Sequence, residues 1–498
     1  MRPRWVAALA LVASRAWAQT AQRCEIADPD AVARVRATVE RLADDALEGR
    51  EPGTRGDRQT VEYLTRALGA LGAEAAGEHG YEQSFTVPYG VQPGGATALT
   101  LTRGDERINL SITDDFRVVT VPGEAAPGRA EGPLVFAGHG LVSEPAGWDD
   151  FAHLGSLRGK IAVVLAGRPE PVDPARRRGL DQHHVQGSLW GKVHYARARG
   201  AIGVIVVETA PGALGATPYL EASGQGIPVV RVSSRVGAQL LGASPVPLGA
   251  PPTGPRALGW SAALVVETEA RSVTTSNVIA RFRGASPERE RLGALVIGAH
   301  RDHIGHGVRT SRTPGSTAIH NGADDNASGT AVVLEIAGRI ARARLPRDVV
   351  TVWFGAEELG LLGSQHLVAH PVPATANTAA MFNFDMVGRL RGCRLFVEAS
   401  QSGRGFEAAL RAANGPYQFD ARPWEPSRGS WGSSDHESFL QAHIPALFFF
   451  TGLHDDYHSP SDDPATLNYE GLASVAGFAE AVLRGAAAAP EGDLRPRR

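Results

Sequence analysis

The sequence predicts an α/β fold with a mostly parallel central sheet, helices on both faces of that sheet, and an inserted strand-rich module. One observation is the rhythm of strand, helix and strand from Ser276 onward, in which apolar runs such as "ALVIGAH" alternate with helical patterns. That alternation is typical of parallel sheets that helices cover on both sides. A second observation is the change near Glu131 to short apolar runs punctuated by Gly and Pro. With 498 residues, 43% of them hydrophobic, the chain can build two or three domain cores.

The N-terminus has the pattern of a secretory signal peptide. Two arginines precede an apolar core, and the small-residue motif "AWA" ends at Ala18. A membrane anchor needs about 20 apolar residues, and Arg15 ends this run too early. We therefore expect removal of residues 1–18 and export of the remaining chain to the periplasm or the extracellular space, with no membrane span.

Charge and cysteine content narrow the possible functions. The formal net charge of −3 does not indicate binding to nucleic acid or to an anionic membrane surface. Cys24 and Cys393 are the two cysteines, and in an oxidising compartment they can pair, although their spacing leaves the pairing open. Because two cysteines cannot form a zinc ribbon, any metal must be bound by His and carboxylate side chains.

The remaining elements follow in chain order. Two amphipathic helices are predicted after the signal peptide, with apolar residues at helical spacing: Val32, Val35, Val39 and Leu42, then Val61, Leu64, Leu68 and Leu71. Residues 19–130 and 256–490 are assigned to one larger domain, and residues 131–255 to the inserted module. That module ends in a Pro-rich linker (243–255). Residues 491–498 form a C-terminal tail.

The predicted sheet delivers ligand-type side chains to one edge. Parallel sheets bind ligands at the carboxyl ends of their strands. Three apolar runs end there in imidazole or carboxylate groups, and two loops carry more of them: His300, Asp302, Glu357, Glu358 and Asp385, then Asp324, Asp325 and His458. Two adjacent glutamates where a buried strand ends imply a metal, a basic partner or plain solvent exposure.

Each of these features has an ordinary explanation when it is taken alone. An Asp before a helix is usually an N-cap, a lone His is usually structural, and "DD" is usually a solvated turn. Five such features at one sheet edge instead favour a metal site.

The motifs "AHRDH", "NGADDNASG", "AEELGLLGS", "FDMVGR" and "YHSPSD", in this order over residues 298–463, resemble the co-catalytic dinuclear zinc aminopeptidases and their glutamate-carboxypeptidase relatives. The module containing "LRGKIAVVLAGRP" and "KVHYARARGAIGVIVVE" resembles a protease-associated domain. The segment "LADDALEGREPGTRGDRQTVEYL" resembles the N-terminal segment of the same family. The resemblance thus covers nearly the whole chain and implies the zinc exopeptidase fold.

The resemblance implies two Zn²⁺ ions per chain and their ligands. His300 and Asp385 would bind one zinc, and Glu358 and His458 the other. Asp325 would bridge both ions, and the family pattern implies a cis peptide bond after it.

Other positions take supporting or catalytic roles by the same resemblance. Asp302 would orient or polarise the ring of His300, and Asp462 has a supporting role. Glu357 would be the general base, and Tyr457 matches a residue that stabilises the oxyanion in some relatives. Nearby imidazoles are expected to act around the site rather than as ligands: His303, His306, His320 and His454. Asp435 and His436, in "SSDHESF", match the family without an assigned role.

These roles together imply an exported zinc exopeptidase that acts on the N-termini of peptides or proteins. Zinc lowers the pKa of a bound water to about 7, and Glu357 would take its proton and pass it to the leaving amine. Three alternatives stay open: a carboxypeptidase, which needs an arginine cluster for the free carboxylate, a glutaminyl cyclase-like enzyme, and a non-catalytic binding relative. The sequence does not indicate an oligomeric state.

Overall fold

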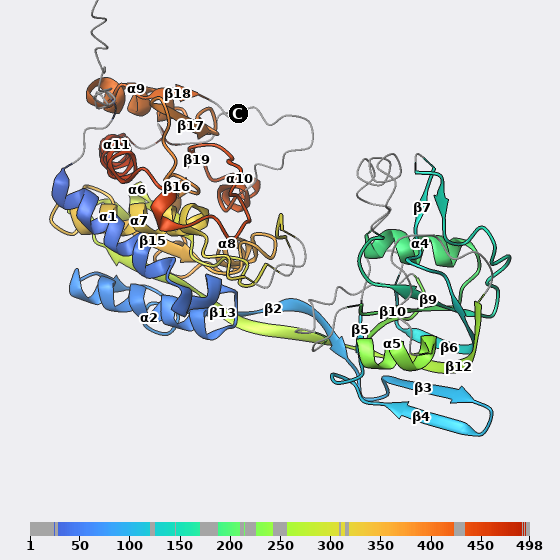
Figure 1. Cartoon of the computed structure of the whole chain (residues 1–498). Helices are drawn as coiled ribbons and strands as arrows, with labels where there is room; N and C mark the ends of the chain where they lie inside the picture. The colour runs from blue at the N-terminus through green and yellow to red at the C-terminus, as the bar shows by residue number, and fades with distance from the viewer. Residues whose placement is uncertain are drawn as a thin grey trace, which may run out of the picture. The chain divides into compact units, whose positions relative to one another are not determined.

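The protein is described by a computed structural model that covers residues 24, 28–119, 125–144, 146–169, 188–209, 214, 226–242, 256–307, 310–313, 318–422, 434–490, 492 and 494. Three predicted segments lie outside these residues: the signal peptide, the Pro-rich linker 243–255 and most of the tail 491–498. The chain divides into two compact units (Figure 1). The first comprises residues up to Phe85 and from Thr274 onward, and the second is Thr86–Val273.

A sheet of nine described strands forms the centre of the first unit. Its order is β1-β13-β15-β14-β16-β19-β17-β18, with β2 paired to β13. The strands are β1 (Glu74–Ala75), β2 (Glu82–Pro93), β13 (Thr268–Phe282), β14 (Ala294–His300), β15 (Val349–Phe354), β16 (Thr378–Phe384), β17 (Arg394–Glu398), β18 (Asp420–Arg422) and β19 (Ala446–Phe450). The four central strands β15, β14, β16 and β19 are parallel, as predicted. Antiparallel pairs flank them on both sides.

Helices cover both faces of this sheet. The helices are α1 (Pro29–Leu42), α2 (Arg55–Ala70), α6 (Arg289–Leu292), α7 (Gly329–Ile340), α8 (Leu362–Ala369), α9 (Phe406–Tyr417), α10 (His436–Gln441) and α11 (Tyr469–Ala488). Side chains of β14 alternate between two cores, as strand geometry requires. Leu295 and Ile297 pack with α1, α2, α7, α9 and α11, whereas Val296 packs with α8 and α10.

The first two helices begin where the sequence predicts. The Asp28 carboxylate accepts a hydrogen bond from the backbone N–H of Asp30 at 3.1 Å, and Pro29 occupies the first turn of α1. Thr54 caps α2 through the backbone N–H of Asp57. Between these helices lies the 3₁₀ segment η1 (Asp45–Arg50), which carries Arg50 toward the functional site described below.

The second unit is built on a sheet of eight described strands in the order β4-β3-β12-β6-β9-β10-β11-β5. Its elements are β3 (Ala98–Arg103), β4 (Glu106–Leu110), β5 (Phe116–Val118), β6 (Gly128–Phe136), β7 (Val142–Ser143), β8 (Trp148–Asp149), β9 (Ile161–Leu165), α4 (Leu189–Ala198), β10 (Gly203–Val207), β11 (Val229–Val232), α5 (Ser234–Leu241) and β12 (Arg256–Val266). Besides the module predicted at 131–255, this compact unit contains β3 and β12, which pair with each other, and β12 also pairs with β6. The borders 131 and 255 of the inserted domain stay a prediction.

Two further features are the pairing of the cysteines and the length and polarity of the helices. Cys24 and Cys393 form a disulfide with Cα atoms 5.5 Å apart, the pairing that their spacing had left open. Within the residues that the structure describes, helices are too short or too polar to cross a bilayer.

Candidate metal centre

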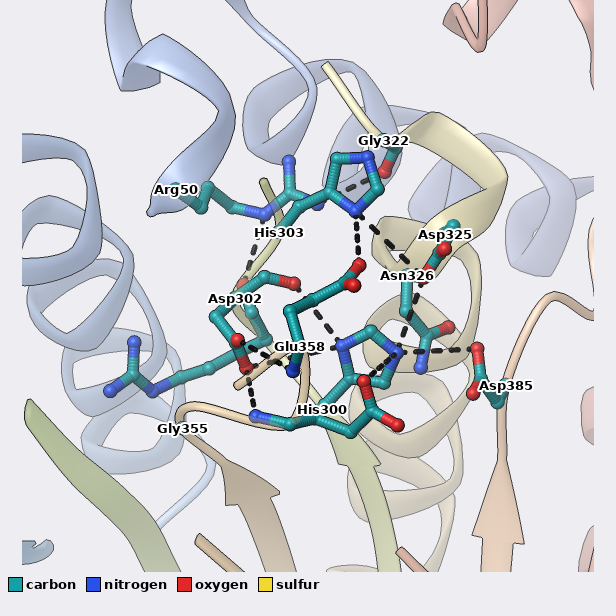
Figure 2. Close-up of polar contacts among 12 residues, drawn as sticks. Arg50, His300, Asp302, His303, Gly322, Asp325, Asn326, Gly355, Glu358 and Asp385 are labelled. Atoms are coloured by element: carbon teal, nitrogen blue, oxygen red, sulfur yellow. Dashed lines mark hydrogen bonds and ion pairs between the residues drawn. The ribbon is translucent and has the colours of Figure 1, made fainter. Parts of the chain in front are cut away.

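The site lies at the carboxyl ends of the central parallel strands, where the sequence predicts it. His300 is the last residue of β14, Glu357 and Glu358 follow β15, and Asp385 follows β16. Figure 2 shows His300, Glu358 and Asp385 converging with Asp325, which comes from the turn η3 (Ala323–Ser328) before α7. Elements far apart in the sequence therefore meet at one point.

The ligand-type atoms form two groups that share Asp325. In one group, His300 Nε2 lies 3.2 Å from Asp325 Oδ1 and 3.3 Å from Asp385 Oδ1. In the other, His458 Nε2 lies 3.2 Å from Asp325 Oδ2 and 3.2 Å from Glu358 Oε2. The two oxygens of Asp325 thus face different groups, which is the arrangement that a bridging carboxylate requires.

The spacing of these atoms fits zinc. Ligands at 2.0–2.1 Å around a tetrahedral ion lie about 3.3 Å from one another, and the four separations above are close to that value. The second ring nitrogen of both His300 and His458 also has a partner, as in most metal-bound histidines. His300 Nδ1 faces the carbonyl oxygen of Asp302 at 3.1 Å, and His458 Nδ1 faces that of Thr310 at 3.2 Å.

The carboxylates of the site carry negative charge that bound cations would compensate. Asp325 and Asp302 are almost inaccessible to solvent, and the carboxylates of Glu357, Glu358 and Asp385 lie beside them. Buried carboxylates cost several kcal/mol each unless cations compensate them. The described residues therefore fit a site for divalent metal.

Asp302 is expected to orient or polarise the ring of His300, and it contacts both that histidine and the two glutamates. The ring of His300 contacts the backbone carbonyl of Asp302, and the Asp302 carboxylate lies 3.9 Å from that ring. The carboxylate instead accepts hydrogen bonds from the backbone N–H groups of Glu357 at 3.1 Å and Glu358 at 3.3 Å. This contact arises because β14 and β15 are adjacent, so that their ends lie together.

The Asp462 carboxylate contacts the backbone at Asp325, the aspartate that the two groups share. Its Oδ2 accepts hydrogen bonds from the backbone N–H groups of Asp324 and Asp325, both at 3.0 Å. Its Oδ1 pairs with Arg389 at 3.1 Å. The peptide bond between Asp325 and Asn326 is cis, which confirms that expectation.

The two adjacent glutamates have opposite electrostatic environments. Burial raises the pKa of Glu357 well above its usual range, and the neighbouring carboxylates of Glu358 and Asp385 raise it further, although His300 opposes them. Burial also favours a raised pKa for Glu358, but His458 and the hydrogen bonds from His303 and His458 outweigh burial and lower it. Environments that separate the pKa values of two carboxyl groups typically assign them different roles.

Tyr457 lies beside His458, with the ring centroids 3.9 Å apart and stacked. Burial raises the pKa of its hydroxyl, and the carboxylates of Asp325 and Glu358 raise it further. The hydroxyl therefore keeps its proton at neutral pH and remains a hydrogen-bond donor.

Three more residues lie near the centre: Ser434 and Arg50, which had no predicted role, and His303, which is expected to act around the site rather than as a ligand. Ser434 donates a hydrogen bond to Asp385 Oδ2 at 2.8 Å, and it belongs to the "SSDHESF" motif that the sequence already singles out. Arg50 lies in the N-terminal motif, and its guanidinium donates to the carbonyl oxygens of Arg301, Asn321 and Gly322. Figure 2 shows Arg50 beside Gly322. His303 lies within the second ligand group.

The remaining imidazoles lie further from the two ligand groups. His454 Nε2 lies 3.1 Å from Asp324 Oδ2, and His320 Nε2 pairs with the hydroxyl of Ser311 at 2.8 Å. His436 stacks on Phe448. Asp435 is fully buried, and burial raises its pKa to about 7. No contact among the described residues gives His436 a place in either ligand group.

Comparisons with known proteins agree with the fold. Residues 277–483 match the family model "Peptidase family M28", and residues 130–240 match "PA domain". Aminopeptidase YwaD of Bacillus subtilis is 28% identical over 360 residues, which are 70% of each chain. An aminopeptidase of Pseudomonas aeruginosa is 28% identical over 235 residues, covering 42% of this chain and 41% of that one.

A solved structure shares the fold. The zinc aminopeptidase BSAP from Bacillus subtilis aligns over 93% of this chain and 97% of its own, with a TM-score of 0.54 and 24% identity. The fold similarity extends over both units, and the M28 match spans the segment that holds all the ligand-type residues above. The chain is therefore similar to peptidase family M28 over residues 277–483 and to PA domains over residues 130–240, in agreement with the resemblance that the sequence predicts.

Proposed function

We propose that the protein is an exported aminopeptidase that binds two zinc ions and hydrolyses the N-terminal peptide bond of peptides or proteins. The observation that carries the proposal is the position of Asp325 between two ligand groups. Its Oδ1 faces His300 and its Oδ2 faces His458, each at 3.2 Å. One shared carboxylate between two sets of His and carboxylate ligands supports a two-metal centre.

In this proposal each metal would have three protein ligands. His300, Asp325 and Asp385 would hold one ion; of the second group, which also contains His303, Asp325, Glu358 and His458 would hold the other. Bound zinc supplies a Lewis acid for the scissile carbonyl and lowers the pKa of water.

The chain's own residues carry the proton transfers. Glu357 Oε2 lies 3.9 Å from His300 Nε2, near the first group but outside hydrogen-bonding distance of its imidazole. Glu357 accepts the proton of the attacking water and then donates it to the leaving amine. Tyr457, which keeps its hydroxyl proton, donates a hydrogen bond to the developing oxyanion.

Export is part of the proposal. It is supported by the N-terminal pattern that ends at Ala18 and by the disulfide between Cys24 and Cys393. Disulfides are typical of proteins outside the cytosol.

The test is digestion of defined peptides, followed by mass spectrometry, with and without a strong chelator. We expect stepwise loss of N-terminal residues, loss of activity with the chelator, and recovery on addition of zinc. Peptides with a blocked N-terminus are the control and should stay intact. Shortening from the C-terminus would support the carboxypeptidase alternative, cyclisation of N-terminal glutamine would support the cyclase alternative, and full activity in metal-free protein would rule out the proposal.

A further inference from the structure

His303 and His458 contact different carboxylate oxygens of the implied ligand Glu358. His303 Nδ1 lies 2.7 Å from Glu358 Oε1. The other oxygen of the same carboxylate, Oε2, lies 3.2 Å from His458 Nε2. Glu358 therefore has two oxygens in two different environments, one beside each imidazole (Figure 2 shows the contact with His303).

Two features separate His303 from the implied metal ligands. The 2.7 Å contact is a hydrogen-bond distance, and it is shorter than the separation of about 3.3 Å expected for two ligands on one tetrahedral zinc. His300 and His458 each direct the second ring nitrogen at a backbone carbonyl. For His303 Nε2, the described part of the chain offers no hydrogen-bond partner. Metal-bound histidines almost always have such a partner, so His303 is better explained as a donor through Nδ1.

The surrounding chain is shaped to hold this ring. His303 is fully buried. Gly322 has φ +57°, and a Cβ at Gly322 would lie 2.6 Å from Cγ and 2.5 Å from Cδ2 of the His303 ring. Arg50 donates a hydrogen bond to the carbonyl oxygen of Gly322 at 3.0 Å and accepts one at its own carbonyl oxygen from the His303 backbone N–H at 3.4 Å. The N-terminal segment η1 thus fixes both loops that enclose the imidazole.

We propose that His303 is a positioning residue that donates a hydrogen bond to Glu358 Oε1, so that Glu358 binds its metal through Oε2 alone. The inference rests on the two-metal centre of the proposed function and specifies its geometry. With one oxygen from Glu358, the second metal has three protein ligands, namely Asp325, Glu358 and His458. One tetrahedral position remains for water or substrate. A carboxylate that used both oxygens would fill that position.

The first experiment counts directly bound imidazoles in the intact protein. Zinc is replaced by Co²⁺, and NMR records the strongly shifted, exchangeable ring N–H signals of metal-bound histidines. We expect two such signals, which disappear one at a time in His300→Ala and His458→Ala. A third signal that is lost in His303→Asn would identify His303 as a direct ligand and overturn the inference.

The second experiment measures zinc affinity by competition with a chelator in wild type, His303→Ala and His303→Asn. Loss of a partner that orients a ligand typically reduces metal affinity 10- to 100-fold. We expect a loss of this size for one zinc in His303→Ala, with the other zinc retained. In His303→Asn the side-chain amide can donate from near the position of Nδ1, so most of the affinity should return. His153→Ala, which removes an exposed imidazole of the second unit, is the control and should keep the wild-type affinity.

The outcomes separate this inference from the proposed function. Wild-type affinity in His303→Ala, or an equal loss in the Ala and Asn variants, would overturn the role of His303 while leaving the two-metal centre intact. Absence of zinc from the wild-type protein would overturn the proposed function, and the inference with it. If His303→Ala does not fold, the Asn variant and the Co²⁺ spectrum of the wild type still decide the question.

Discussion

The backbone N–H of Glu357 donates a hydrogen bond of 3.1 Å to Oδ1 of Asp302. The N–H of Glu358 donates to Oδ2 of the same carboxylate at 3.3 Å. Asp302 therefore fixes the backbone of both glutamates at once, and their side chains diverge from this point. Glu357 reaches toward His300, whereas Glu358 reaches toward His458 and His303. The two neighbours can then serve two different functions.

Replacing Glu357 with Gln should remove the general base and leave the metals in place. The amide keeps the size of the side chain but cannot accept the proton of the attacking water. We expect kcat to fall by roughly 10²- to 10⁴-fold, with wild-type zinc content and little change in KM. Steady-state kinetics together with elemental analysis check this, and loss of one zinc in the variant would show that Glu357 is a ligand instead.

Replacing Glu358 with Gln should weaken one metal. A neutral amide oxygen binds a dication less strongly than a carboxylate, and the amide also changes the contact with His303 Nδ1. We expect purified Glu358→Gln to contain less zinc and to regain part of its activity in excess zinc. The Glu357→Gln variant is the matched control, because excess zinc should not restore it. If Glu358→Gln retained both zincs and excess zinc restored Glu357→Gln, the two roles would be reversed.

Removing the second unit should leave the metal centre intact. All the implied ligands belong to the first unit, and the chain leaves and re-enters that unit between Phe85 and Thr274. The connecting strands β2 and β13 are paired, so a short Gly/Ser-rich linker can join Phe85 to Thr274. We propose that this variant keeps its zinc and its activity on short peptides but changes its preference between long and short ones. Loss of both metals from a folded variant would contradict the proposed borders or the proposed role.

Acid should destabilise the second unit through His139. Burial, and to a lesser extent the charge of Lys192, lower the pKa of His139 to about 4. The unfolded chain, with a pKa near 6.5, binds more protons between pH 6.5 and 4, so stability falls as the pH falls through this window. His139→Leu should reduce this loss by at most about 3 kcal/mol. Hydrogen exchange of the β9 and β10 amides measures the effect, and equal acid sensitivity in both proteins would contradict it.

The sequence predicts the fold class and the position of the site well, because both depend on local patterns. Apolar runs that end in His or carboxylate residues predict the parallel strands around His300 and Asp385, and the structure confirms that they meet at one edge. Capping residues likewise predict the start of α1 at Pro29.

The contacts around the ligands depend on tertiary structure and could not be predicted in the same way. Arg50 lies some 250 residues before the loops that it contacts, and its sequence neighbours do not indicate buried carbonyl oxygens. The carboxylate of Asp302 contacts the backbone after β15 because two strands are adjacent, which a single-chain pattern does not encode. The antiparallel direction of the flanking strands could not be predicted either, because short apolar runs do not show in which direction a strand pairs.

The central claim is that two zinc ions lie on either side of Asp325. A crystal of the wild-type protein, measured with X-rays just above and just below the zinc absorption edge, tests it most directly. We predict two anomalous peaks, one between His300 and Asp385 and the other between Glu358 and His458, with an oxygen of Asp325 next to each. A zinc-loaded crystal with a single peak, or with no peak at Asp325, would contradict the two-metal centre.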